Sequence, residues 1–131
     1  MNSKLDIGRT HSLQSRVEEW MTADRAGNKG VDVLATSVLV QLIEQAAADC
    51  LAPFLEQGQV SVGTHVDLEH REPVPVGFIV RVEVEVVSLD GPRVTFAVRV
   101  FDEQEAVAEG SHERYVIDRA KFMAKSREKL S

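Results

Sequence analysis

The sequence has 131 residues, 44% of them hydrophobic and 27% charged, which predicts one globular domain over residues 1–131 with a single core. Its net charge of −6 argues against a general nucleic-acid-binding protein, because such a protein needs a basic face. No apolar run is long enough to cross a membrane and no signal peptide is visible, so we expect a cytoplasmic protein with no membrane partner.

The N-terminal third of the chain leads into a helix. Residues 12–23, SLQSRVEEWMTA, favour a strand, although a helix fits nearly as well. Residues 24–35 contain two glycines and indicate a loop. The spacing of apolar residues then predicts a helix from Thr36 to about Ala52, capped by Thr36 or Ser37 and ended by the proline that follows.

This helix is apolar over most of its circumference, which is typical of a helix wrapped by other structure. Glu44 is the exception, because an unpaired carboxylate is rarely buried. It shares a stripe with Thr36 and Val40, so it either reaches solvent or is used by the protein. Helical rise separates Thr36 from Glu44 by about 12 Å, so their side chains cannot hydrogen-bond within one regular helix. They would share a site only if Thr36 left the helix at its start or acted across a dimer interface.

From residue 60 onward, apolar and polar residues alternate, which is typical of strands with one buried face. The first of these strands ends near His70, and a segment rich in proline and glycine leads into the next. An Asp-Gly turn then predicts a hairpin. The residues expected to face the core are Val60, Val62, Val66 and Leu68, then Phe78, Val80, Val82, Val84 and Val86, then Val94, Phe96, Val98 and Val100.

A further strand at about 106–117 and a short amphipathic helix, RAKFMAKSREK, complete the predicted elements. One buried helix and at least four long antiparallel strands with one apolar face predict an α+β fold. In this fold the curved sheet wraps around the central helix and buries both. Long strands with exposed edges also favour edge-to-edge pairing into a homodimer.

Few side chains outside the helix are positioned for chemistry. His70 has the parity of the buried residues of its strand, so it should point towards the helix, where it either meets a carboxylate or is a paired structural histidine. His112 and Arg114 share the parity of a later strand, which is also typical of a surface strand. Cys50 is expected to pack in the core. No Cys or His lies at zinc-ligand spacing, so we expect no metal.

In their order and spacing, four segments resemble the fluoroacetyl-CoA thioesterase-like branch of the hotdog-fold acyl-CoA thioesterases. The resemblance covers about residues 13–125. It rests on VLATSVLVQLIEQAA (33–47), VGTHVDLEHREPVPVG (62–77), VEVVSLDGPRVTFAVRVFDE (84–103) and GSHERYVID (110–118).

This resemblance implies a hotdog fold, a homodimer with active sites at the subunit interface, and an acyl-CoA substrate. Coenzyme A would enter as part of that substrate, with no separate cofactor. By the resemblance, Thr36, Glu44 and His70 correspond to the family's catalytic threonine, glutamate and histidine. Glu44 would then be tolerated on the apolar helix because it belongs to a site.

The implied substrate-binding residues lie on two strands. Gly63 matches the glycine beside which the thioester lies, and the Gly63–Thr64 pair offers a point where a ligand can approach the backbone. Arg114 matches the arginine of the family's THER motif, in which Ser111 replaces the threonine. The segment 26–35 departs from the fluoroacetyl-specific member, which carries bulky aromatic side chains there, because it has no aromatic residue. We therefore expect a small or medium acyl-CoA as substrate in place of fluoroacetyl-CoA.

These assignments predict a scheme for thioester hydrolysis. Glu44 would attack the carbonyl or activate water, and His70 would take and return protons. Thr36 would orient the water or intermediate, and a backbone N–H near Gly63 would stabilise the oxyanion.

Three alternatives remain at this level. The first is a non-catalytic acyl-CoA or acyl-carrier binding protein on the same fold. The second is an enoyl-CoA hydratase or dehydratase, which needs an Asp/His pair, but Asp67 has the wrong strand parity to join His70. The third is a cystatin-like α+β cone, which usually begins with several helices, whereas one strong helix precedes the long strands here.

Overall fold

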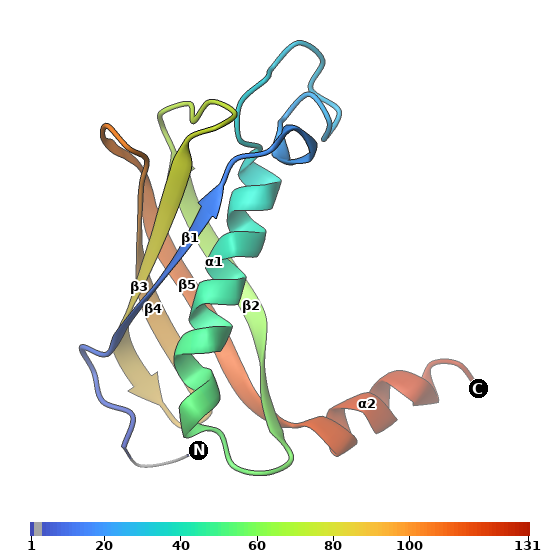
Figure 1. The fold of residues 1–131 in the computed structure, drawn as a ribbon. Helices are drawn as coiled ribbons and strands as arrows, with labels where there is room; N and C mark the ends of the chain where they lie inside the picture. The colour runs from blue at the N-terminus through green and yellow to red at the C-terminus, as the bar shows by residue number, and fades with distance from the viewer. Residues whose placement is uncertain (2–3) are drawn as a thin grey trace.

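The computed structural model describes Met1 and residues 4–131. Its elements are β1 (Thr10–Arg16), a 3₁₀ turn η1 (Glu19–Met21), α1 (Thr36–Leu51), a 3₁₀ turn η2 (Ala52–Phe54), β2 (Gln59–His70), β3 (Ile79–Asp90), β4 (Arg93–Phe101), β5 (Ala106–Asp118) and α2 (Arg119–Glu128). Figure 1 shows the sheet curving around α1, the loop before α1 above the helix's N-terminal end, and α2 projecting from the body of the fold.

The five strands form one antiparallel sheet in the order β1-β3-β4-β5-β2. The chain therefore crosses from one edge strand, β1, through α1 to the other edge strand, β2. The outer sides of β1 and β2 pair with no other strand in the described part of the chain. In β2 the register against β5 shifts between Gly63 and His65, so Thr64 lies at a β-bulge.

The core fills the space between α1 and the concave face of the sheet, and in β3 and β4 it follows the predicted alternation. In β2 the prediction that Val60 and Val62 face the core is wrong, because Val62 pairs with the exposed Tyr115, whereas their neighbours Ser61 and Gly63 pair with the buried Val116 and Arg114. The register shift after Gly63 reverses the parity, so the predicted orientation holds only from Val66 onward. Burying one large apolar side chain in this core stabilises the fold by about 1.5–3 kcal/mol relative to leaving it exposed. The strand residues of this core that are at most 2% exposed include Val80, Val82, Val84, Val86, Val94, Phe96, Val98 and Val100. From α1 the fully buried residues are Leu39, Ile43, Ala46, Ala47 and Leu51, and Cys50 packs beside them as predicted.

The start of α1 differs from the prediction. The helix begins at Thr36, but its N-cap is Ala35, and no side chain caps it. The prediction that Thr36 or Ser37 caps the helix is therefore wrong. Thr36 is instead the first helical residue, and its hydroxyl is free to bond elsewhere. The C-terminal end is close to the prediction, because Pro53 lies in the 3₁₀ turn that follows Leu51.

Two other elements differ in extent or character. The first strand covers residues 10–16 where 12–23 was predicted, and the 3₁₀ turn occupies 19–21. The helix α2 forms, but none of its residues is buried, so the apolar side of the predicted amphipathic helix remains exposed. Phe122 and Met123 are exposed on it. Among the described residues, no helix combines the length and apolar character that crossing a bilayer requires.

Candidate active site

The N-terminal end of α1 meets the C-terminal end of β2 through two predicted site residues. Thr36 Oγ1 lies 2.9 Å from His70 Nδ1, a hydrogen-bond distance. The contact joins residues 34 positions apart in sequence, and it exists because α1 begins where β2 ends. His70 therefore points towards the helix, as its strand parity predicted. Its partner there is the hydroxyl of Thr36, whereas the prediction had included a carboxylate.

The other nitrogen of His70 is buried and has no hydrogen-bond partner among the described residues. A buried polar atom without a partner is rare in folded proteins and is characteristic of catalytic or ligand-binding groups. Burial lowers the pKa of His70 below its usual value, and the backbone at Glu72 opposes this shift. The ring is therefore neutral at pH 7, the form in which it can accept a proton.

A cleft of about 710 Å³ opens beside Thr36 and His70. This volume falls in the usual range for small-molecule sites. Its remaining lining residues, mostly small or aliphatic, come from the loop before α1, the first turn of α1 and the segment after β2. They are Ala23, Ala26, Asn28, Val31, Val33, Leu34, Ala35, Ser37, Arg71, Glu72 and Pro73.

A second cluster surrounds Glu44 near the middle of α1. Its Oε2 atom lies 3.6 Å from Nη1 of Arg114, whose side chain is only 7% exposed, while that of Glu44 is 45% exposed. Burial lowers the pKa of Arg114, and attraction to Glu44 opposes that shift. Glu44 also lies against the backbone of Gly63, where an added Cβ would meet Oε2 at 2.5 Å. A half-exposed carboxylate is thus held between a buried guanidinium and a glycine on β2.

The two clusters remain separate within one chain. Glu44 forms no hydrogen bond or ion pair with Thr36 or His70 in the described residues, in agreement with their separation along the helix. Thr64, at the β2 bulge, is exposed and directly follows Gly63, and its hydroxyl donates to the Glu113 carbonyl at 3.3 Å. The chain therefore presents two half-sites, one with Thr36 and His70 and one with Glu44, Gly63 and Arg114.

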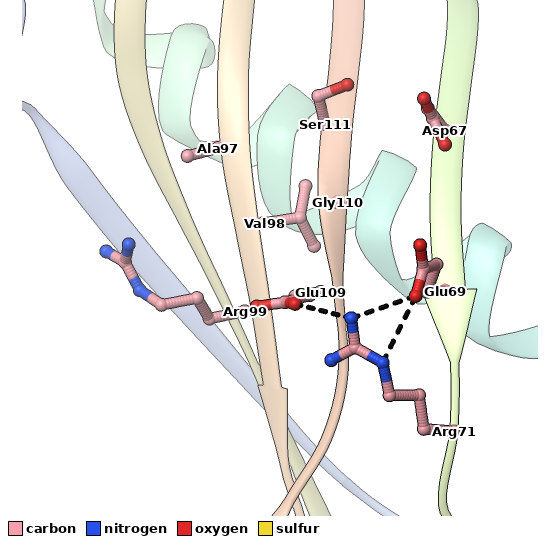
Figure 2. A pocket seen from close by; sticks show the side chains of 9 residues that line it. All are labelled: Asp67, Glu69, Arg71, Ala97, Val98, Arg99, Glu109, Gly110 and Ser111. Atoms are coloured by element: carbon pink, nitrogen blue, oxygen red, sulfur yellow. Dashed lines mark hydrogen bonds and ion pairs between the residues drawn. The ribbon is translucent and has the colours of Figure 1, made fainter.

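Another hollow, of about 420 Å³, lies on the face of the sheet opposite α1 (Figure 2). Inside it Arg71 pairs with two carboxylates, with Glu69 at 2.8 Å and with Glu109 at 2.7 Å. None of the predicted site residues lines this hollow. The described residues also contain no group of three or more His, Cys, Asp or Glu side chains arranged to hold a metal.

One residue of the Glu44 cluster was noted in the sequence for its strand parity but not assigned to the site. His112 is fully buried and lies 3.2 Å from Arg114, from its Nε2 to Nη1. The shared strand parity of His112 and Arg114 was the signal in the sequence, because it places both side chains on one face. In the structure that face is the buried one, so the alternative of a surface strand is wrong.

Solved structures with the same fold are numerous and closely superimposable. A hot-dog-like protein from Thermanaerovibrio acidaminovorans matches with a TM-score of 0.90 at 23% identity, covering 97% of this chain and 94% of that one, and supports the fold alone. A Thermus thermophilus protein of the thioesterase superfamily matches with a TM-score of 0.90 at 26% identity over 96% of this chain and 93% of that one. The predicted hotdog fold is confirmed, which excludes the cystatin-like cone. The chain therefore has the fold of this thioesterase-superfamily protein.

Sequence comparisons narrow the class further. Residues 17–120 match the family described as fluoroacetyl-CoA-specific thioesterase. The fluoroacetyl-CoA thioesterase of Streptantibioticus cattleyicolor is 39% identical over 98 residues, which are 75% of this chain and 70% of that protein. A solved structure of the fluoroacetyl-CoA thioesterase FlK matches with a TM-score of 0.91 at 31% identity, covering 97% of this chain and 98% of that one. The chain belongs to the fluoroacetyl-CoA-specific thioesterase family.

Proposed function

We propose that this thioesterase hydrolyses small or medium acyl-CoA thioesters, with Thr36, Glu44 and His70 as its catalytic residues. The observation that carries the proposal is the His70 ring, which is neutral, hydrogen-bonded to Thr36 on one side and without a described partner on the other. Such a ring can take a proton from the attacking water and return it to the departing thiolate. Membership of the thioesterase family identifies the reaction as thioester hydrolysis.

The acyl group would occupy the cleft beside Thr36 and His70. Its lining from the loop before α1 consists of alanines, valines, a leucine and an asparagine, with no Phe, Tyr or Trp among the lining residues. This supports an aliphatic acyl chain longer than the two-carbon group that names the curated relative. Gly63, Thr64 and Arg114 would contact the thioester end, where a backbone N–H near Gly63 would stabilise the oxyanion.

The separation of the half-sites supports a homodimer in which each active site is shared. The free edge of β2 is available for antiparallel pairing with a second copy. If the two-fold axis passes between Val66 and Asp67, His70 of the second copy lies opposite Gly63 of the first. Glu44 lies against Gly63, so this pairing would bring Glu44 and His70 from different copies into one site.

Release of free thiol from a panel of acyl-CoA esters tests the reaction. The panel runs from acetyl to decanoyl and includes phenylacetyl and fluoroacetyl esters. We expect turnover that is greatest for an aliphatic ester and that falls by at least about 100-fold in Glu44→Gln, because the amide can neither attack nor accept a proton. Full activity of Glu44→Gln would contradict the scheme, and binding of acyl-CoA without turnover would favour a non-catalytic binding protein.

Mixed dimers test the shared site. Glu44→Ala and His70→Ala chains are each expected to be inactive alone. When they are co-expressed, half of the dimers pair one chain of each kind, and one of the two sites in such a dimer is intact. Mixing should therefore restore about a quarter of wild-type activity if the site is shared. No restoration, with heterodimers demonstrated by mass spectrometry, would show that each site is built from one chain.

A further inference from the structure

His112 belongs to the Glu44 cluster, although in the described residues it forms no hydrogen bond with the carboxylate. It is the fully buried histidine of β5, and its ring stacks on Phe96 with centroids 6.2 Å apart. Its Nδ1 atom lies 2.8 Å from the backbone carbonyl of His65. A carbonyl can only accept a hydrogen bond, so Nδ1 carries the proton. The second nitrogen, Nε2, faces Nη1 of Arg114 at 3.2 Å.

This arrangement requires a neutral imidazole. The guanidinium of Arg114 only donates, so Nε2 must present its lone pair. A doubly protonated ring would direct an N–H and a second positive charge at Arg114. The charged and titratable groups facing the ring are Arg114 on β5, Glu44 on α1 and His65 on β2. Burial lowers the pKa of His112, which agrees with the neutral form.

Every branch of the Arg114 guanidinium is held. Nε donates to Ser61 Oγ at 2.9 Å and Nη2 donates to the Ser61 carbonyl at 3.0 Å. Nη1 donates to His112 and also lies 3.6 Å from Glu44. Ser61 therefore holds one edge of the planar guanidinium of Arg114, and His112 holds the edge that faces Glu44. Without His112, Nη1 would keep only the half-exposed carboxylate as a partner.

We infer that His112 is a positioning residue for thioester hydrolysis: its neutral ring aligns Arg114, and through Arg114 it fixes the Glu44 carboxylate against Gly63. The inference rests on the proposed use of Glu44 in the reaction. The β2 bulge contributes to it, because the carbonyl that sets the His112 tautomer belongs to His65, directly after the register shift.

Two substitutions separate alignment from packing. His112→Phe keeps a ring against Phe96 but removes both hydrogen bonds, whereas His112→Gln keeps a neutral acceptor within reach of Arg114. We expect His112→Phe to lower kcat by about 10- to 100-fold with little change in KM, since a displacement of about 1 Å has that effect on a reacting group. His112→Gln should restore most of the lost rate. Phe96→Leu is the matched control, because it loosens the same part of the core without touching Arg114.

The inference is overturned if His112→Phe retains wild-type kcat, or if Phe96→Leu lowers kcat as much at an equal loss of thermal stability. A second readout is the double variant. Because His112 acts through Glu44, adding His112→Phe to Glu44→Gln should lower kcat by less than about twofold further, whereas independent effects would multiply. Full activity in Glu44→Gln would contradict the proposed function itself. If Glu44→Gln is inactive but His112→Phe is fully active, only the role of His112 is contradicted.

Should His112→Phe fail to fold, nitrogen NMR of the wild-type protein still tests the inference. The Nδ1–H tautomer gives separate signals for a protonated Nδ1 and an unprotonated Nε2. Observation of that pattern at neutral pH supports the inference. A ring protonated on both nitrogens, or on Nε2 alone, would overturn it, because neither form can accept a hydrogen bond from Arg114.

Discussion

Replacing Gly63 by alanine would test the position of the Glu44 carboxylate directly. The new Cβ would lie 2.5 Å from Oε2 of Glu44, whereas ordinary contacts begin at 3.4 Å, so the oxygen must retreat by about 0.9 Å. A second neighbour, Cε1 of His112, lies at 3.2 Å and needs to move by only a few tenths of an ångström. A displacement of this size in a reacting group lowers rates by up to about 100-fold, so we expect kcat to fall between about 10- and 100-fold.

Stability should change little in the same variant. Gly63 does not have a positive φ, so alanine fits its backbone, and the displaced atom is the end of a flexible, 45% exposed side chain. We expect the melting temperature to remain within about 3 °C of the wild type. The assay is thiol release with the best acyl-CoA ester, alongside a thermal melt. Gln57→Ala, at an exposed position in the turn before the same strand, is the control and should leave both values unchanged. If Gly63→Ala kept more than about half of the wild-type kcat, the assignment of Glu44 as a precisely held catalytic group would be refuted.

Three further predictions follow from other contacts. Gly110→Ala should cost about 1–3 kcal/mol of stability, because its Cβ would collide with the backbone carbonyl of Asp67, which cannot move aside; an unchanged melting temperature would contradict this. Burial holds the pKa of His70 and of His112 below the ordinary 6.5, so the unfolded chain binds protons that the folded chain does not. The stability that these two neutral histidines contribute is therefore fully present above their unfolded-state pKa and falls as the pH drops below it. Melting temperatures measured from about pH 7.5 down to about pH 5.5 should show this loss, and the loss should be smaller in His112→Phe. Ala26→Phe should partly fill the cleft and lower kcat/KM for the decanoyl ester by at least about tenfold while leaving the acetyl ester within a few-fold; equal effects on both esters would place the acyl chain elsewhere.

The parts of the fold that follow from periodicity were predictable from the sequence. Strict alternation from Val80 to Val86 and from Val94 to Val100 can be satisfied only by strands with one buried face, and the structure buries every one of these valines. The Asp-Gly turn between them fixes the hairpin. The parity of His70 correctly directed it to the helix, because alternation relates each residue of a strand to its buried neighbours.

The residues that were misjudged depend on contacts between distant segments. Thr36 has the side chain of a typical N-cap, but packing at the end of β2 offers its hydroxyl a partner in His70, and Ala35 takes the cap position. The extent of β1 is set by pairing with β3, which its own sequence does not encode. The role of His112 needed the knowledge that the β2 bulge presents the His65 carbonyl to it. The two hydrogen bonds join residues 34 and 47 positions apart, and the β1–β3 pairing joins residues still farther apart, so none of them leaves a local pattern.

Cys50, packed in the core at 2% exposure with its thiol pKa raised by burial, has a practical consequence. It is the only cysteine of the sequence. Thiolates react with disulfide reagents and neutral thiols do not, so the folded protein contributes almost no background when coenzyme A is titrated as it is released. On unfolding, the same thiol becomes reactive, one equivalent per chain. A reagent that reports turnover in the native protein thus reports loss of the native core in a heated or denatured one, with no added label.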